Sequence, residues 1–166
     1  MLMMMLLAIT AATRTIDIAS AYFVPDEVAL KSLCSAVHRG VRVRVITPGP
    51  HTDQDTVRHA SRGLWGPMLE AGVEIYEYQP TMYHCKMLIV DGLMASLGST
   101  NFDPRSFHLN DEANLNVYEA DFAQRMTEVF EADLRRSKRI TLEAWQNRPA
   151  KEKLRERVSA LLAPIL

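Results

Sequence analysis

The chain has 166 residues, of which 48% are hydrophobic and 23% are charged, and its formal net charge is −1. This length fits one globular domain with a sizeable core and argues against two domains. The nearly balanced charge argues against a broad, sequence-independent nucleic-acid surface, although it leaves room for a local basic site. The two cysteines, Cys34 and Cys85, are too far apart for a metal-binding spacing or a disulfide framework.

The N-terminal segment, residues 1–14, is an uncharged run rich in Met and Leu that ends at Arg14. The run is shorter than the roughly 20 residues needed to span a bilayer, and it lacks the positive start of a signal peptide. Its apolar residues fall on all sides, which predicts a helix covered on every side by other parts of the protein. This abrupt beginning suggests a chain that starts partway into a larger protein.

The next segments predict a β-helix-β unit. Residues 15–23 alternate at first and stop at Pro25, which is typical of a strand. Asp26 is a candidate N-cap for a helix over 27–39, and Gly40 is suited to end it. Residues 41–46 alternate cleanly and predict a second strand. Such a unit implies parallel pairing through a right-handed crossover.

The rest of the chain predicts further helices and strands. A helix is expected over 55–71 and a strand over 73–78, followed by a hairpin of strands 83–90 and 94–97 that turns at Asp91-Gly92. The remaining expected elements are a strand over 113–118, a helix over 121–137 capped by Asp121, and C-terminal helices within 141–166, over 142–147 and 150–162. The predicted fold is one α/β domain, 1–166, with a mixed, mostly parallel sheet between helices.

The candidate catalytic residues lie between Tyr83 and Asn101. In a strand, residues two apart point to the same face, so His84 and Lys86 are expected to project side by side. Asp91 closes this apolar run, and the loop after the next strand carries Asn101. An imidazole, an ammonium and a carboxamide together suit the handling of a phosphate group.

The spacing of these residues resembles the HxKxxxxD signature, extended by GSxN, of the phospholipase D superfamily. His84, Lys86 and Asp91 match the first part, and Gly98, Ser99 and Asn101 the second. Stretches along nearly the whole chain, from 21–26 to 139–148, resemble the C-terminal catalytic half of bacterial cardiolipin synthases. The resemblance implies half of a phospholipase D-like fold and transfer of a phosphatidyl group through a phosphohistidine.

The resemblance also implies roles for single residues. Two facing motifs each supply a histidine, and His84, in the C-terminal motif, is expected to be the acid/base, with the nucleophile as the alternative. Lys86 and Asn101 would stabilise the phosphoryl oxygens in place of a metal. Glu112 resembles the carboxylate that orients a motif histidine. Asp91 belongs to the motif, but we expect it to anchor the turn rather than to transfer protons.

Three residues are candidates for contacts with the substrate. Tyr22 lies where the first predicted strand ends, at the same sheet edge as the motif, and it could line the pocket or only pack in the core. Ser99 could donate a hydrogen bond in the site or only fit a tight turn. Arg105 could engage a lipid phosphate, although pinning its loop to Asp103 is the favoured role.

The chain holds one motif, whereas a cardiolipin synthase needs two. It could be an excised C-terminal half, which we rank first, or pair with a separate half, or form a homodimer. The expected partners are a phosphatidylglycerol-like phospholipid and a second motif-bearing half, with peripheral association at a bacterial inner membrane that follows from the lipid substrate alone. No cofactor or metal is expected. The alternatives are a homodimeric phosphodiesterase or nuclease, for which the charge offers no support, and an isolated non-catalytic half-domain.

Overall fold

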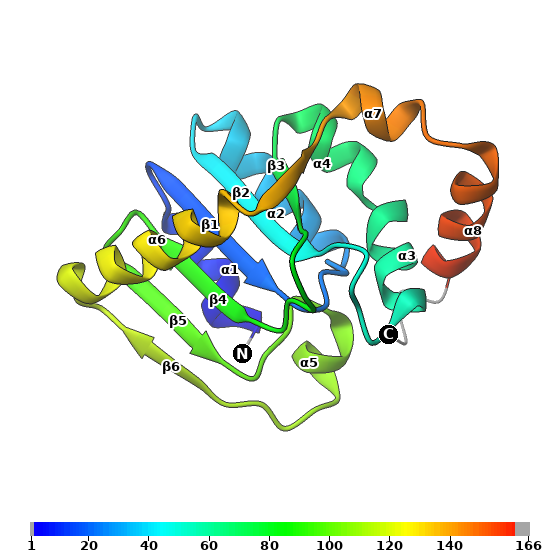
Figure 1. The fold of residues 1–166 in the computed structure, drawn as a ribbon. Coiled ribbons are helices and arrows are strands. Elements are labelled where there is room, and N and C mark those ends of the chain that lie inside the picture. Colours follow the sequence, from blue (N-terminus) through cyan, green and yellow to red (C-terminus); the bar gives the residue numbers. More distant parts are fainter. Residues whose placement is uncertain (1, 162–166) are drawn as a thin grey trace.

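The computed structural model describes residues 2–161, and these form a seven-stranded sheet with helices on both faces (Figure 1). The strand order is β6-β5-β4-β1-β2-β3-β7. The strands are β1 (Thr15–Ser20), β2 (Arg42–Pro48), β3 (Glu74–Tyr78), β4 (Lys86–Val90), β5 (Met94–Gly98), β6 (Asn114–Val117) and β7 (Ser137–Ile140). The helices are α1 (Leu2–Ala11), α2 (Glu27–His38), α3 (Asp55–Gly63), α4 (Trp65–Ala71), α5 (Pro104–His108), α6 (Ala120–Leu134), α7 (Leu142–Gln146) and α8 (Ala150–Ala160).

The pairing confirms a mixed α/β sheet between helices, as predicted. Parallel pairing is confined to the centre, where β1 pairs with β2 and β2 with β3, as the β-helix-β pattern predicted. The other four pairings are antiparallel, so the expectation of a mostly parallel sheet is corrected. The difference arises because β4 and β5 form a tight hairpin, β6 returns beside β5 after a longer connection that contains α5, and β7 runs back along the edge of β3.

Several element boundaries differ from the predicted ones. The helix expected over 55–71 is two helices that meet at Leu64. Pro67 accounts for the break, because a proline lacks the N–H for the bond to Gly63 and its ring clashes with that turn. Residue 84 lies before β4 rather than inside a strand, and β7 was not predicted. Glu119, not Asp121, caps α6, accepting from the N–H groups of Asp121 and Phe122. Met1 and Leu162, included in the predicted terminal helices, lie outside the described residues.

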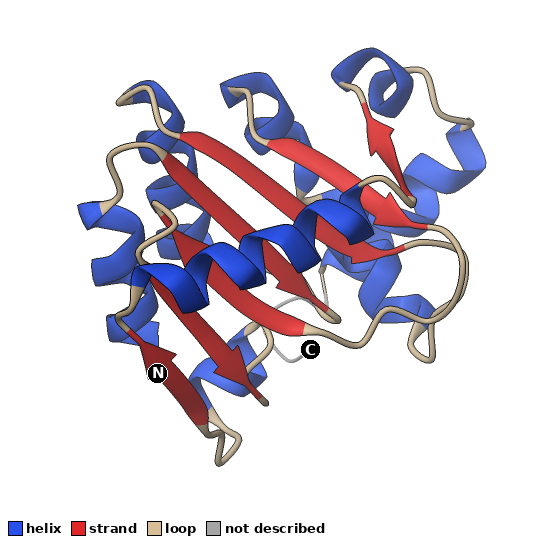
Figure 2. Ribbon diagram, turned by 60° about the vertical axis from the view of Figure 1, so that its left-hand side comes forward, coloured by secondary structure: helices blue, strands red, loops and turns tan. Residues whose placement is uncertain are grey.

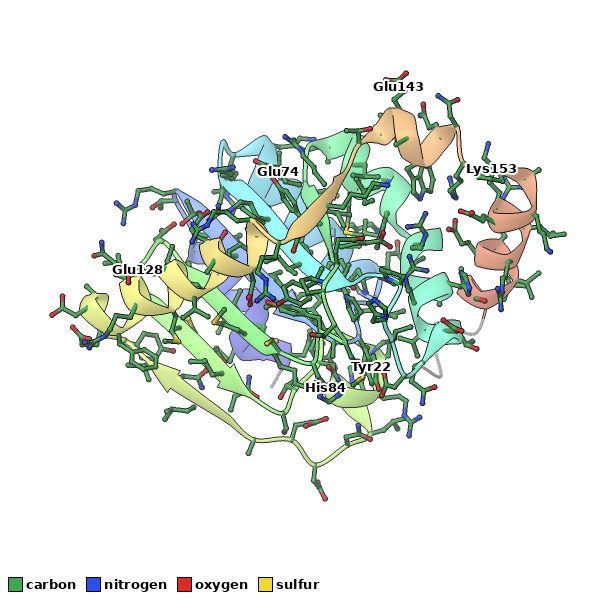
Figure 3. All side chains as sticks on the ribbon, in the orientation of Figure 1. Tyr22, Glu74, His84, Glu128, Glu143 and Lys153 are labelled. Atoms are coloured by element: carbon green, nitrogen blue, oxygen red, sulfur yellow. The ribbon has the colours of Figure 1, made fainter. Side chains whose placement is uncertain are left out.

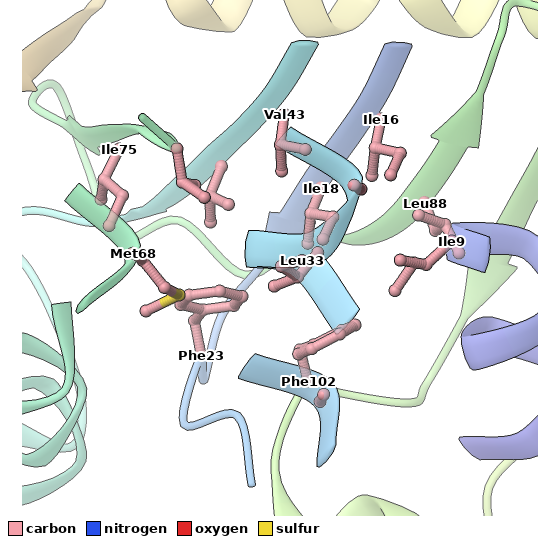
Figure 4. Close-up of a cluster of buried hydrophobic side chains, with 14 of the residues drawn as sticks. Ile9, Ile16, Ile18, Phe23, Leu33, Val43, Met68, Ile75, Leu88 and Phe102 are labelled. Atoms are coloured by element: carbon pink, nitrogen blue, oxygen red, sulfur yellow. The ribbon is translucent and has the colours of Figure 1, made fainter. Parts of the chain in front are cut away.

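Two hydrophobic clusters fill the space on the two faces of the sheet. The larger one lies under α1, α2 and α4 and includes Ile9, Leu33 and Met68 packed on Ile16 and Ile18 of β1 (Figure 4). The smaller one lies under α6, which crosses the opposite face of the sheet (Figure 2), and centres on buried Ala123 and Phe130. The clusters fix the strands whose ends carry the candidate site.

Helix α1 is covered on one side only. Met5 and Ile9 are buried, whereas Met3 and Leu7 remain 70% and 63% exposed. Residues 2–161 therefore cover one side of α1, and the expectation that further protein covers its other side stays a prediction. The Met and Leu residues on its outer side face solvent in this structure.

A buried ion pair ties the centre of the sheet to α6. Arg44 of β2 and Asp17 of β1 are register partners and are 4% and 2% exposed. The guanidinium donates to both carboxylate oxygens at 2.6 and 2.8 Å and also to Glu131 of α6. It lies over the Phe130 ring, 5.1 Å from its centroid. Charges this deeply buried must be paired in order to be stable.

Candidate functional site

The candidate site lies where β1 ends, β4 begins, and the chain between β5 and α5 passes close by. The Ala21 N–H donates to the Cys85 carbonyl at 3.0 Å, which extends the β1–β4 pairing past its last register pair. Phe23 and Phe102 form a parallel bridge, held by hydrogen bonds from Val24 N–H and Phe102 N–H. These backbone contacts bring three loops that are distant in sequence to one edge of the sheet.

His84 and Lys86 lie together at this edge. The Lys86 ammonium is 3.2 Å from Nδ1 and 3.4 Å from Nε2 of His84, and it also donates to the His84 carbonyl at 3.2 Å. The Tyr22 ring meets the imidazole edge to face at 6.0 Å and lies 5.9 Å from the ammonium (Figure 3). His84 is exposed, and Lys86 is half-buried. The predicted adjacency is therefore present, although it comes from a loop and not from strand alternation.

Burial lowers the pKa of Lys86 from its ordinary value, because desolvation disfavours the ammonium. Three nearby carboxylates, those of Asp53, Glu112 and Asp103, oppose this shift. The Lys86 ammonium therefore lies near carboxylates, and it is placed beside His84, where it can bind an incoming anion.

A hydrogen-bond chain joins Asn101 to Glu112. The Asn101 N–H donates to Ser106 Oγ at 3.2 Å, and that hydroxyl donates to Glu112 Oε1 at 2.9 Å. Although burial raises it, hydrogen bonds from Ser99, Ser106 and Asn110 hold the pKa of Glu112 below its ordinary value. Within residues 2–161, Glu112 has no hydrogen bond to His84. The orienting role of Glu112 therefore stays a prediction.

Asn101 and Ser99 are both held by backbone contacts. The Tyr22 N–H donates to Asn101 Oδ1 at 3.4 Å, and the Asn101 residue is 8% exposed. Ser99 Oγ accepts from the Ala113 N–H at 3.1 Å, which ties the GSxN loop to the start of β6. Gly98 permits this contact, because a Cβ there would lie 2.1 Å from the Ala113 carbonyl oxygen.

Tyr22 and Arg105 occupy different settings. The Tyr22 hydroxyl donates to Asp53 at 2.7 Å, and burial together with this carboxylate raises the pKa of Tyr22 to about 12. Its ring faces the site, where a substrate contact is possible. Arg105 is exposed, and in the described chain it makes no ion pair with Asp103, whose side chain instead accepts from the Ser106 N–H. The pinning role predicted for Arg105 therefore has no counterpart in these contacts.

Asp91 lies at the opposite end of β4 from Lys86, away from the site. Its carboxylate accepts from the N–H groups of Thr13, Arg14 and Thr15 at 2.7–2.9 Å and from the Thr13 hydroxyl at 2.8 Å. Asp91 and Gly92 have positive φ values of 55° and 65°, as in the turn of a tight antiparallel hairpin. These contacts support the anchoring role and place Asp91 apart from proton transfer.

Replacing Asp91 by Asn is expected to destabilise the fold by about 1 kcal/mol at pH 7, since it removes a charged acceptor from a solvent-accessible turn. Although burial raises it, the hydrogen bonds hold the pKa of Asp91 below its ordinary 3.8. A depressed pKa contributes stability above the unfolded-state pKa, and this contribution disappears as pH falls through the folded-state pKa. Urea unfolding from pH 7 to pH 3 should therefore show the variant and the parent converging at acid pH.

The matched control is Asp111→Asn, which removes an exposed carboxylate that makes no hydrogen bond or ion pair within residues 2–161. It should leave both the stability and its pH dependence unchanged. A constant gap between Asp91→Asn and the parent across this pH range would contradict the anchoring role of the carboxylate.

Sequence reasoning overlooked the residues that hold the site together. Ser106 bridges Asn101 and Glu112, and Ser20 receives the Phe102 N–H at 3.0 Å. Asp103 caps α5 with Pro104 following at its start, a pattern that could have predicted this short helix. Asp53 had no comparable signal, because its contact with Tyr22 depends on how two loops meet.

The site is open rather than enclosed. His84 is exposed at the sheet edge, near the labelled Tyr22 (Figure 3). In residues 2–161, no three His, Cys, Asp or Glu side chains are grouped so as to hold a metal ion. Over the same residues, no helix is long and apolar enough to cross a bilayer.

Comparison with solved structures supports the fold. The chain superposes on a phosphatidylserine synthase from Haemophilus influenzae with a TM-score of 0.77 and 15% identity, covering 98% of this chain and 44% of that one. It also superposes on Nuc, a phospholipase D family member from Salmonella typhimurium, with a TM-score of 0.73 and 20% identity, covering 84% and 90%. At these identities, the likeness establishes a phospholipase D-like fold.

Comparison with curated sequences identifies the family. The chain is 44% identical over 158 residues to a cardiolipin synthase of Geobacillus kaustophilus and 37% identical to cardiolipin synthase 1 of Staphylococcus epidermidis. These matches cover 95% of the chain but only 31% and 32% of the relatives, so the chain spans about a third of their length. Residues 5–134 match the family described as cardiolipin synthase, PLD-like domain. The chain therefore belongs to the phospholipase D-like domain family of the cardiolipin synthases.

Proposed function

We propose that this domain supplies one half of a two-histidine centre that transfers a phosphatidyl group from one phosphatidylglycerol to another. The observation that carries the proposal is the contact of the Lys86 ammonium with both ring nitrogens of His84. The two side chains can engage one phosphoryl group together. The 44% identity to a cardiolipin synthase supports the substrate class.

In the proposed reaction, a histidine of the second half attacks the phosphorus of one phosphatidylglycerol. The bond between phosphorus and the terminal glycerol oxygen breaks, and protonated His84 gives its proton to that oxygen. A hydroxyl of a second phosphatidylglycerol then attacks the phosphorus, passes its proton to neutral His84, and releases the first histidine. The products are one cardiolipin and one glycerol.

Lys86 and Asn101 stabilise the phosphoryl oxygens in this scheme. The ammonium offers a charge-assisted donor beside His84. The Tyr22 N–H donates to Asn101 Oδ1, so the Nδ2 group of Asn101 is left to donate to a phosphoryl oxygen. Glu112, which accepts a hydrogen bond from Ser106, is the carboxylate that we assign to orient a motif imidazole.

A homodimeric phosphodiesterase is the second candidate, since this chain has one motif and matches 90% of the Nuc chain in fold. In that case two copies of His84 would face each other across a twofold axis. The net charge of −1 does not favour a nucleic-acid substrate.

A chimera separates the two candidates. The matched 158 residues of the Geobacillus kaustophilus cardiolipin synthase are replaced by this chain, and the chimera and the isolated chain are each incubated with labelled phosphatidylglycerol and with labelled DNA. We expect cardiolipin from the chimera only and no DNA cleavage by either protein. Cleavage of DNA by the isolated chain would contradict the proposal and favour the homodimeric enzyme.

A further inference from the structure

Helix α8 has its polar side inside and its apolar side outside. Glu156 and Ser159 are 0% and 8% exposed, whereas Leu154, Val158 and Leu161 are 65%, 57% and 80% exposed. The spacing of the three apolar residues places them on one stripe of the helix. This is the reverse of a helix that packs its apolar face on a core, so the exposed stripe requires an explanation.

The buried polar side fixes the helix firmly on α3. Glu156 accepts from Arg62 Nε at 2.7 Å and also from Arg148. Gly63 allows the close approach, because a Cβ there would lie 2.9 Å from the Glu156 carbonyl oxygen and 3.1 Å from Ala160 Cβ. The orientation of α8 is thus set by specific contacts, and these contacts hold its apolar stripe outward.

A cationic cavity of about 480 Å³ lies beside this stripe and is lined mainly by residues of α3, β7, α7 and α8. Two of its lining residues, Lys151 and Arg155, also border the shallow depression over Leu154 and Val158. Six cationic side chains and two carboxylates line the cavity: Arg58, Arg62, Lys138, Arg139, Lys151, Arg155, and Glu77 and Glu152.

The charges of the cavity are only partly matched. Glu77 is buried and accepts from both Arg58 and Arg62, so its charge is already shared. Arg58 Nε and His59 Nδ1 are buried and have no hydrogen-bond partner in the described chain. Burial and the positive charges of Arg155 and Arg58 lower the pKa of His59. Lys138, Lys151 and Arg155 make no ion pair within residues 2–161, so the cavity keeps an excess of positive charge.

Building on the proposed function, we propose that α8 docks the domain on an anionic phospholipid bilayer, with its apolar stripe in the interface and a lipid phosphate in the cationic cavity. An apolar stripe flanked by Lys and Arg is the arrangement by which interfacial helices bind such surfaces. The charge complementarity selects an anionic bilayer over a neutral one. The apolar side chains of the stripe insert at the level of the acyl chains, while Lys151 and Arg155 reach the lipid headgroups.

Co-sedimentation of the 166-residue chain with vesicles tests this surface. The chain should bind vesicles of mixed phosphatidylglycerol and phosphatidylcholine and should bind phosphatidylcholine vesicles at least about tenfold more weakly. The variants Lys151→Glu/Arg155→Glu and Leu154→Ser/Val158→Ser should each lose about tenfold or more of the binding to the anionic vesicles. The control Arg125→Glu/Arg135→Glu changes two exposed arginines, in α6 and at its C-cap, by the same charge and should bind as the parent does.

Thermal unfolding of each variant checks that the fold is retained, and Lys151→Gln/Arg155→Gln serves if the charge reversal unfolds the chain. Equal binding by the α8 variants and the parent would overturn the proposal. So would binding that does not depend on lipid charge, displacement of the vesicles by DNA, or a dimer that dissociates in Leu154→Ser/Val158→Ser. His84→Ala should bind vesicles normally, so that failed docking and failed transfer by the chimera are distinguished.

Discussion

Replacing His84 by Ala in the chimera is expected to lower the rate of cardiolipin formation by a factor on the order of 10³, the range for loss of a general acid and base. The side chain is exposed, and within residues 2–161 its hydrogen-bond and aromatic contacts are with Lys86 and Tyr22, so the fold should remain intact. Lys86→Ala should cost on the order of 10²–10³, the range for loss of a donor to the transferring oxygens. Thin-layer separation of labelled lipids measures both rates.

The control is His51→Ala, which removes an exposed histidine from the loop after β2. It should transfer at the parent rate. A folded His84→Ala chimera that still makes cardiolipin at the parent rate would contradict the assignment of His84 to the reaction.

Replacing Arg44 by Met is expected to destabilise the domain by about 3–5 kcal/mol, the largest effect on stability that the structure predicts. The variant leaves the Asp17 carboxylate, 2% exposed, without its bidentate partner in the centre of the sheet. Denaturant unfolding followed by circular dichroism measures the change, with the slope compared between variants to confirm that the transition stays two-state.

Arg42→Met is the matched control on the same strand. The Arg42 side chain is 54% exposed and pairs with Glu74, so its loss should cost no more than about 1 kcal/mol. The double variant Asp17→Leu/Arg44→Met removes both charges and should recover part of the lost stability. The view that the unpaired charge causes the loss would be contradicted if the double variant lost as much free energy of unfolding as Asp17→Leu and Arg44→Met lose together.

The local pattern of the chain predicted most of the fold. Alternation over 41–46 and the capped helix after Asp26 led to the parallel centre, and Asp91-Gly92 led to the hairpin. The predictions failed for elements whose conformation depends on tertiary contacts. Residues 137–140 form β7 because the edge of β3 is available to pair, a fact that their polar sequence does not carry.

The sequence predicted which residues meet at the site better than it predicted how they are arranged. His84 and Lys86 meet as expected, but the strand begins only at Lys86, and the loop conformation brings the imidazole back over the ammonium. The Ser106 bridge to Glu112 and the Asp53 bond to Tyr22 join loops that are far apart in sequence. Such contacts depend on loop conformation, which residue spacing does not determine. Helix α8 was predicted from the sequence, yet which of its sides faces solvent depends on the partners of Glu156.

The central claim is that His84 serves as the acid and base beside a histidine nucleophile in the other half. Rapid acid-free quenching of the chimera with labelled phosphatidylglycerol, followed by peptide mass spectrometry, tests it most directly. The account predicts a phosphatidyl label on the histidine of the first motif and none on His84. A label on His84, or cardiolipin formed while no histidine is labelled at any time, would contradict it.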